Sequence, residues 1–326
     1  MAFMDGVLVI DKPAGLTSHD VVARVRRILG ERRIGHTGTL DPFATGVLVI
    51  LVGRATRLAQ FLSGAEKEYE AVIRLGYATD TGDLTGRPLP KVEHAGCVRS
   101  QGLSDEEIET ALAGLRGEID QVPPMYSAKK HQGRKLYELA RRGEEIERPA
   151  VRVTIHEFES LRKDGRLLTK SEDATSDLVV RVVCSAGTYI RTLAEDLGRR
   201  CGVGAHLIAL RRTRAGDFRI TKAVTLEELQ EKVSHHEVAD LTVSTDAALS
   251  PLPFLHLTAA DAARTRNGMQ VRVETHSTTA WVDGERVRMR EADGSLIAIG
   301  LFDKASGTLQ PKVVLAPEPV ARASRP

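Results

Sequence analysis

Hydrophobic and polar positions along the chain predict strands that alternate irregularly with helices. Apolar runs at residues 7–10 and 47–52 are typical of buried strands, and residues 69–75 alternate as a half-exposed strand does. A further strand is predicted at residues 178–184, and the polar, turn-rich residues 162–177 before it predict a mobile hairpin or insert. The long connections favour a mixed α/β sheet over a regular βαβ repeat.

Three segments have the period of an amphipathic helix. The first follows Thr17-Ser18, which offer an N-cap, and stops before Gly30. The second begins with the capping box Ser104-x-x-Glu107 and has Gly117 as its stop, and the third covers residues 188–200. The positions expected to face inward are Val21, Val22, Val25, Ile28, Leu29, Ile108, Leu112, Leu115, Ile190, Leu193, Ala194 and Leu197.

The pattern of apolar and turn-forming residues changes near residues 250–253, Ser-Pro-Leu-Pro. Short strand-like pieces follow, separated by turn pairs such as Asn267-Gly268 and Asp283-Gly284, which is typical of a small β-rich domain. The predicted units are therefore a first domain over residues 1–250, a second over 251–316, and a flexible tail over 317–326.

The composition is that of an ordinary globular protein, with 42% hydrophobic and 28% charged residues. No run approaches the roughly 18 apolar residues of a membrane span, and the N-terminus lacks the pattern of a signal peptide. Cys97, Cys184 and Cys201 share no short spacing, so neither a disulfide framework nor a cysteine metal site is predicted. A cytoplasmic location is the expectation.

Charge adds a weaker signal. The net charge of +2 is too small to imply a nucleic-acid partner. Basic clusters such as residues 24–27, 129–131 and 211–214 could follow a phosphate backbone, although each could equally be a solvated helix face. The pair His235-His236 has no further partner at metal-ligand spacing and is interpreted as a solvated turn.

One segment could carry chemistry: residues 35–46, Gly-His-Thr-Gly-Thr-Leu-Asp-Pro-Phe-Ala-Thr-Gly. Its glycines allow a tight loop, and the loop presents one carboxylate, that of Asp41. From spacing alone, a structural Asx-turn in which Asp41 caps its own backbone is the favoured interpretation.

Several short sequence motifs, taken in their order along the chain, change the interpretation of this segment. They are residues 9–15, 35–46, 67–69, 75–86, 121–129, 184–191 and 204–212. In that order they resemble the TruB family, the tRNA pseudouridine(55) synthases, over nearly the whole chain. The resemblance implies an α+β fold, with a mixed-sheet synthase domain and a small C-terminal PUA-like RNA-binding domain. It also implies the isomerisation of uridine to pseudouridine at position 55 in the T-loop of tRNA.

The resemblance assigns the chemistry to three residues. Asp41 would be the essential carboxylate, which either adds to C1′ of the sugar or removes a sugar proton. Arg191 would keep that carboxylate ionised against desolvation and the RNA phosphates. Tyr69 would stack on the flipped uracil, and its hydroxyl is a weaker candidate for handling the C5 proton. The reaction is redox-neutral and implies no cofactor and no metal.

The same resemblance assigns residues that bind the substrate. Tyr189 and Leu210 would line the pocket, and His36 would stabilise the T-loop opened by base flipping. Residues 125–148 would form a mobile insertion that grips the T-arm through Lys129, Arg141 and Arg142, among other basic residues. The implied partner is the T-arm stem-loop of tRNA, with no membrane and no obligate protein partner. A monomer is expected because the sequence has no long exposed apolar stripe.

Three other functions compete with this assignment. A glycoside hydrolase would need a second carboxylate in a comparable loop, and none is found. A pure RNA-binding module is compatible with the basic clusters and predicts that Asp41→Asn leaves function intact. An RNA-guided synthase would be expected to carry long charged tails and protein partners, and this chain has a short tail.

Overall fold

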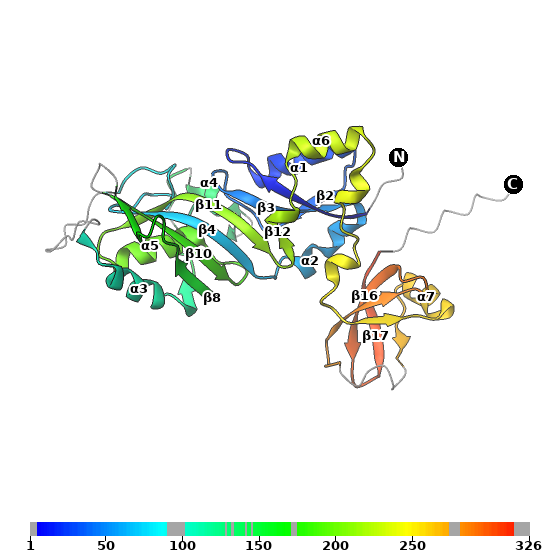
Figure 1. Cartoon of the computed structure of the whole chain (residues 1–326). Coiled ribbons are helices and arrows are strands. Elements are labelled where there is room, and N and C mark those ends of the chain that lie inside the picture. Colours follow the sequence, from blue (N-terminus) through cyan, green and yellow to red (C-terminus); the bar gives the residue numbers. More distant parts are fainter. Residues whose placement is uncertain are drawn as a thin grey trace.

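A computed structural model describes residues 5–89, 102–127, 129–131, 134–140, 142–144, 146–170, 175–273 and 281–315. Within these residues the chain forms one large sheet with helices on its faces and a smaller sheet at its C-terminal end (Figure 1). The predicted tail at 317–326 lies outside the described residues, as does part of the 162–177 segment. No helix in the described ranges has the length and hydropathy that crossing a bilayer requires.

The large sheet is mixed. Its central path runs β1 (Gly6–Lys12), β3 (Thr45–Val52), β11 (Ala205–Ala215), β4 (Lys67–Leu75), β10 (Ser176–Cys184), β8 (Val151–Ser160), β5 (Gly117–Gln121). Three short strands pair alongside: β2 (Ile34–Thr37) with β3, β9 (Leu168–Lys170) with β10, and β12 (Phe218–Arg219) with β11. Strand β11 is parallel to β3 and antiparallel to β4, which confirms the predicted α+β fold with a mixed sheet.

Helices cover the two halves of this sheet separately. The helices are α1 (Ser18–Leu29), α2 (Ala59–Leu62), α3 (Asp105–Ala113), α4 (Leu136–Ala140), α5 (Ile190–Arg200), α6 (Leu226–Ser234) and α7 (Ala259–Arg266). Apolar side chains of α3 and α5 share one core with β4, β8, β10 and β11. Those of α1 and α6 share another with β1 and β3. The seam between the halves, where β11 meets β3, positions the site described below.

The predicted helices form, with two shifts at their ends. Helix α1 has its capping box at Thr17 and ends at Gly30, which adopts the left-handed conformation with φ 65°. Helix α3 ends at Ala113, before the expected stop at Gly117. Helix α5 begins at Ile190 rather than at residue 188, because Tyr189 is its N-cap and has extended backbone, with φ −101° and ψ 106°.

The C-terminal sheet packs directly on the large one. Its order is β13 (Phe254–His256), β15 (Arg286–Arg290), β16 (Leu296–Asp303), β17 (Thr308–Val314), β14 (Val271–Arg272). Ile299, Val313 and Leu315 join a core with residues of β1 and β3, and Arg54 donates to the carbonyl of Leu315 at 2.7 Å. The division at residue 250 and the PUA-like character of this sheet stay predictions.

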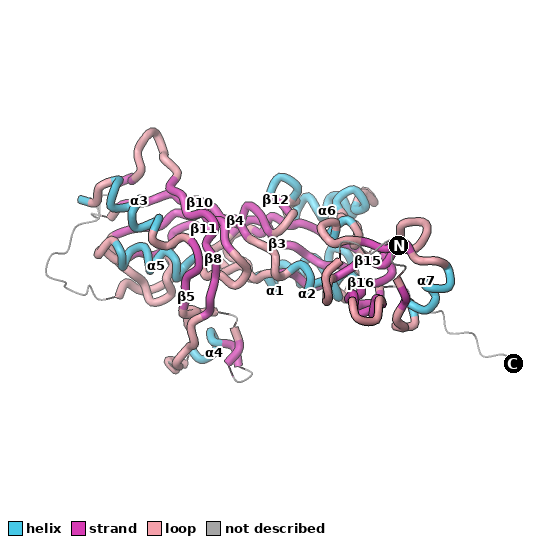
Figure 2. The backbone as a smooth tube through the Cα atoms, turned by 90° about the horizontal axis from the view of Figure 1, so that it is seen from below, coloured by secondary structure: helices cyan, strands magenta, loops and turns pink. Residues whose placement is uncertain are grey.

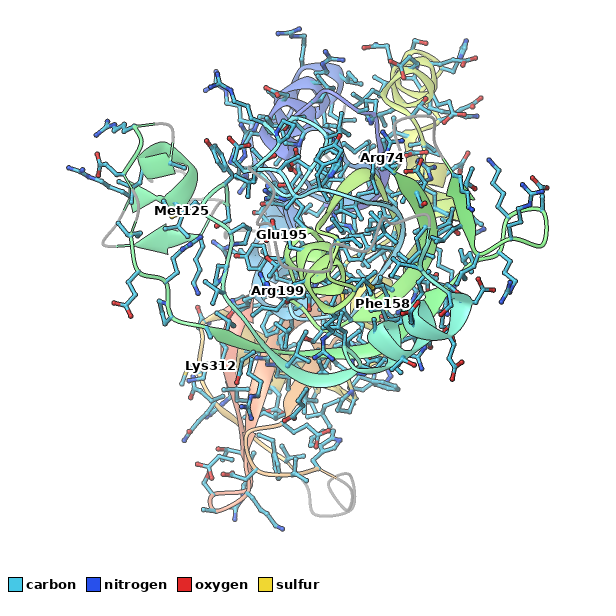
Figure 3. The ribbon with its side chains drawn as sticks, turned by 90° about the vertical axis from the view of Figure 1, so that its left-hand side faces the viewer. Arg74, Met125, Phe158, Glu195, Arg199 and Lys312 are labelled. Carbon is cyan, nitrogen blue, oxygen red and sulfur yellow. The ribbon has the colours of Figure 1, made fainter. Side chains whose placement is uncertain are left out.

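Within the predicted 125–148 insertion, the described residues from 130 to 140 stand away from the main body. They contain β6 (Lys130–His131), β7 (Arg134–Lys135) and α4, which lie outside the sheet in Figure 2. Met125 lies on the segment that leads into this projection (Figure 3).

Candidate active site

The loop between β2 and β3, which carries Asp41, is held by hydrogen bonds to residues of β1 and α1. The fully buried Lys12, at the end of β1, donates through Nζ to the carbonyls of Pro42 at 3.1 Å and Ala44 at 2.6 Å. From α1, the hydroxyl of Ser18 accepts from the amide of Leu40 at 2.9 Å. A loop held at both ends in this way presents its side chain in one orientation.

Asp41 and Arg191 form a bidentate ion pair. Arg191 Nε donates to Asp41 Oδ2 at 2.9 Å, and Nη2 donates to Oδ1 at 3.1 Å. The guanidinium is only 4% exposed and also donates to the carbonyls of Thr81 at 2.8 Å and Tyr126 at 2.7 Å. The carboxylate therefore accepts from an arginine 150 residues away rather than from its own loop, so the Asx-turn interpretation is wrong.

The charges around Asp41 pull its pKa in opposite directions. Burial raises the pKa of this carboxyl, and the nearby Asp83 raises it further, while Arg191 and Lys12 lower it, with a net rise. Asp83 is itself buried and lies 3.8 Å from Arg191 Nη1. A carboxylate of raised pKa that is nevertheless paired with a cation is a stronger base and nucleophile than an exposed aspartate.

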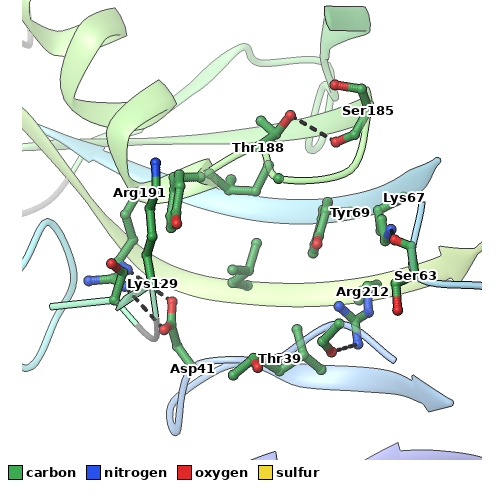
Figure 4. A pocket seen from close by; sticks show the side chains of 17 residues that line it. Thr39, Asp41, Ser63, Lys67, Tyr69, Lys129, Ser185, Thr188, Arg191 and Arg212 are labelled. Carbon is green, nitrogen blue, oxygen red and sulfur yellow. Dashed lines mark hydrogen bonds and ion pairs between the residues drawn. The ribbon is translucent and has the colours of Figure 1, made fainter. Parts of the chain in front are cut away.

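A pocket of about 270 Å³ opens at this ion pair (Figure 4). Its lining includes the side chains of Asp41, Lys67, Tyr69, Lys129, Tyr189, Arg191, Leu210 and Arg212. Six of the sequence-predicted site residues therefore line one pocket, although they come from β4, β11, α5 and several loops. These six are Asp41, Tyr69, Lys129, Tyr189, Arg191 and Leu210.

Tyr69 lies in the middle of the pocket lining. It projects from β4, is 8% exposed, and lies close enough to Arg212 for that charge to act on the pKa of its hydroxyl. Burial raises the pKa of this phenol above its ordinary value, so the hydroxyl stays protonated at neutral pH. Leu210, buried on the adjacent strand β11, supplies an apolar surface in the same pocket.

Two of the described residues that were predicted to bind the substrate, His36 and Arg142, do not line this pocket. His36 lies on β2 against His19, with ring centroids 5.6 Å apart, and burial lowers its pKa to about 4, so it is neutral. Arg142 is exposed after α4. Arg141 lies outside the described residues.

The sequence interpretation assigned no role to Lys12, Lys67, Asp83 or Arg212. All four are buried, and all four lie within blocks that carry the resemblance. Their charges within otherwise apolar or alternating segments are the sequence feature that could have identified them. Charged residues are rarely buried without a partner or a function. Within the described ranges, no group of three or more potential metal ligands is found, and His235 and His236 are exposed.

Comparisons with known proteins match most of the chain. A sequence profile described as "TruB family pseudouridylate synthase (N terminal domain)" matches residues 26–190. Another, "tRNA pseudouridylate synthase B C-terminal domain", matches residues 191–253. The "tRNA pseudouridine synthase B" of Thermobifida fusca is 44% identical over 96% of this chain and 99% of its own length. The protein of that name from Bacillus cytotoxicus is 44% identical over 86% of this chain and 88% of its own.

Solved structures resemble the fold at lower identity. A protein in the "Crystal Structure of a Cbf5-Nop10-Gar1 Complex" has a TM-score of 0.71 and 27% identity, and the match covers 96% of this chain and 85% of that one. A chain in the "Structure of H/ACA RNP bound to a substrate RNA containing 2'-deoxyuridine" has a TM-score of 0.67 and 25% identity, with 96% and 85% covered.

Proposed function

Because the chain belongs to the TruB family of pseudouridylate synthases, it is a tRNA-modifying isomerase of uridine, and we propose that it acts on uridine 55 of the T-loop. In this proposal Asp41 is the catalytic carboxylate and the reaction needs no cofactor. The observation that supports it best is the bidentate pair of Asp41 and Arg191 at a pocket beside Tyr69.

The reaction leaves the elemental composition of the nucleoside unchanged. The N1–C1′ bond breaks, C5 bonds to C1′, the C5 proton leaves and N1 gains one. An ionised Asp41 can assist in two ways, either by adding to C1′ or by removing a sugar proton. Both routes need the carboxylate form, which the adjacent guanidinium favours.

The uracil would be held between an aromatic and an aliphatic side chain. A base inside a folded T-loop has to be turned out of its stack, at a cost of a few kcal/mol. Tyr69 and Leu210 offer buried apolar surface that offsets this cost. Tyr189, which also lines the pocket, is fixed through its backbone, since its amide donates to Gln121 Oε1 at 3.0 Å.

The RNA would be gripped outside the pocket by the projecting 125–148 segment. Lys129 on this segment lines the pocket and Arg142 is exposed on it, so one element could contact both the everted nucleotide and the stem phosphates. Arg141 is assigned to the same contact from the sequence. His36 would stabilise the opened loop in its neutral form.

Guided modification is the alternative that the solved structures raise, because the Cbf5 relative lies in a complex with protein partners. The curated relatives named for tRNA are more similar, at 44% against 27% identity. We therefore propose that the protein acts alone, as a monomer, on the T-arm.

The test is tritium release from C5-labelled uridine in a T-arm stem-loop, with purified protein and no guide RNA. Asp41→Asn should bind the stem-loop with unchanged affinity. Its rate of tritium release should fall by at least roughly 10³-fold, because the variant lacks the carboxylate that acts on the sugar.

Asp177→Asn is the matched control. Asp177 also accepts two hydrogen bonds from an arginine, Arg74, at 2.8 and 2.9 Å, but away from the pocket. This variant should release tritium at the wild-type rate. An inactive wild type, or an Asp41→Asn enzyme that turns over normally, would refute the proposal.

A further inference from the structure

The pocket has a second charged end, on the side of Tyr69 away from the ion pair (Figure 4). Lys67, at 7% exposed, and Arg212, at 1%, both line it. They converge on one point, because a methyl group placed on the α-carbon of Gly38 would lie 3.4 Å from Arg212 Nη1 and 3.8 Å from Lys67 Cε. We refer to Lys67 and Arg212 as the cationic end.

Among the residues that the structure describes, no carboxylate compensates either charge of the cationic end. Lys67 Nζ donates to the carbonyls of Ser63 at 2.6 Å and Ala65 at 2.5 Å, and Arg212 donates to two backbone carbonyls at 2.7 and 3.0 Å. In the part of the chain that the structure describes, neither residue forms an ion pair. Burial and the charge of Arg212 lower the pKa of Lys67 to about 8. Two unpaired buried cations are costly and are typical of sites that receive negative charge.

The cationic end also has donors to spare. An ammonium has three N–H donors and a guanidinium has five. Lys67 uses two of its donors on carbonyls, and so does Arg212. Within the described residues, one N–H of Lys67 and at least two of Arg212 are therefore left without a partner.

The reaction creates a negative charge that the Asp41–Arg191 pair does not stabilise. When the N1–C1′ bond breaks, its electron pair stays on the ring, and the uracil becomes an anion with charge on N1, O2 and O4. Asp41 is an anion itself and would oppose this charge. Fixed donors that face a developing oxyanion in a partly desolvated site are among the strongest catalytic devices of proteins.

We propose that the cationic end binds a carbonyl oxygen of the target uracil and stabilises the ring as it detaches from the sugar. This inference rests on the proposed function, since it assigns two further catalytic residues to the same pocket. The detached ring then turns and C5 gives an electron pair to C1′, which frees Asp41 if it had added there. The C5 proton then passes to water, and N1 takes a proton from water. Lys67 and Arg212 neither donate nor take a proton in these steps.

The experiment compares two stem-loops that carry uridine or 5-fluorouridine at the target position. Fluorine withdraws electrons and stabilises the uracil anion, so its departure depends less on the protein. Single-turnover loss of the N-linked nucleoside is measured by nuclease digestion and mass spectrometry. Lys67→Met should slow the uridine substrate by about 100-fold and the 5-fluorouridine substrate by only about tenfold. The charge-preserving Lys67→Arg should stay within about tenfold of wild type on both.

If part of the variant were unfolded, the rates on both substrates would fall by the same factor. The ratio of the two rates would then be unaffected. Equal losses on the two substrates would overturn the inference. If they came with weaker RNA binding, the cationic end would hold a backbone phosphate instead. The proposed function fails separately, through a wild-type enzyme that is inactive on the uridine stem-loop.

Discussion

At the scale of single residues, the site depends on one buried arginine whose guanidinium donates to four oxygen atoms. Arg191 donates to both oxygens of Asp41 and to two backbone carbonyls, so the guanidinium is fixed before any RNA arrives. Its partner is held by the buried Lys12 through the loop backbone. Preorganisation of this kind avoids reorienting charged groups during the reaction.

Arg191→Met should therefore move the acidic limb of the pH profile of kcat/KM to higher pH. Arg191 and Lys12 lower the pKa of Asp41, whereas burial and Asp83 raise it. Without the guanidinium the pKa rises further, so the ionised carboxylate is lost earlier as pH falls. We expect a shift of about one to two pH units.

Tritium release measured from about pH 5 to 9 checks this shift. Arg191→Lys keeps a cation but not the bidentate geometry, and its limb should fall between those of the wild type and the Met variant. An acidic limb that stays in place, or moves to lower pH, would show that Asp41 is not the group that titrates.

At the scale of secondary-structure elements, the parallel contact of β3 and β11 is the joint on which the pocket depends. In this contact Gly46 pairs with Arg212 and has φ +98°, and a methyl group on its α-carbon would lie 2.2 Å from the carbonyl oxygen of Arg212. Only glycine allows the backbones to approach this closely. The joint thus places the Asp41 loop beside Arg212.

Gly46→Ala should destabilise the protein by about 3 kcal/mol, because it combines a left-handed backbone with a clash against main chain. Gly35→Ala, in the neighbouring strand β2, is the matched control. Its new methyl group would meet only Thr56 Cγ2 at 3.7 Å, an ordinary contact, so stability should hardly change. Denaturant unfolding measures both, and equal stability of the two variants would contradict this account of the joint.

Elements with regular patterns were predictable, and irregular ones were not. The sequence indicated β1, β3, β4, β10 and the three helices α1, α3 and α5. It did not indicate β11, because register shifts at residues 207/209 and 212/214 break its alternation and a buried arginine occupies a core position. The helix α6 was also missed, although its capping box at Thr225 and Glu228 can be found in the sequence.

At the scale of the whole molecule, the C-terminal sheet is locked to the rest of the chain. The buried Arg288 donates to the carbonyls of Leu252 at 2.9 Å and Ser250 at 3.1 Å, and lies 3.2 Å from Asp246 Oδ2. Arg290 forms a second pair with Asp246. One carboxylate therefore fastens two arginines of β15 to the segment between the sheets. The contacts fix where the second sheet stands relative to the pocket.

Asp246→Ala should lower stability by about 2 kcal/mol, because it leaves a buried guanidinium without its anion while the pocket stays intact. The melting temperature should fall by several degrees, and tritium release from the short stem-loop should stay at the wild-type rate below that temperature. Glu237→Ala breaks an exposed pair with Lys232 and should leave the melting temperature unchanged. A drop in melting temperature as large for Glu237→Ala as for Asp246→Ala would refute the special role of Asp246.

The sequence by itself determined the local elements with regular periods and, through blocks in a fixed order, the family and the position of Asp41 in a tight loop. Hydrophobic period and turn chemistry act between near neighbours, so they can be found along the chain. Only the tertiary structure decided that Asp41 lies against Arg191 and that Lys67 and Arg212 converge beyond Tyr69. These contacts join positions up to 150 residues apart, and their distances and burial depend on how β3, β4, β11 and α5 pack together.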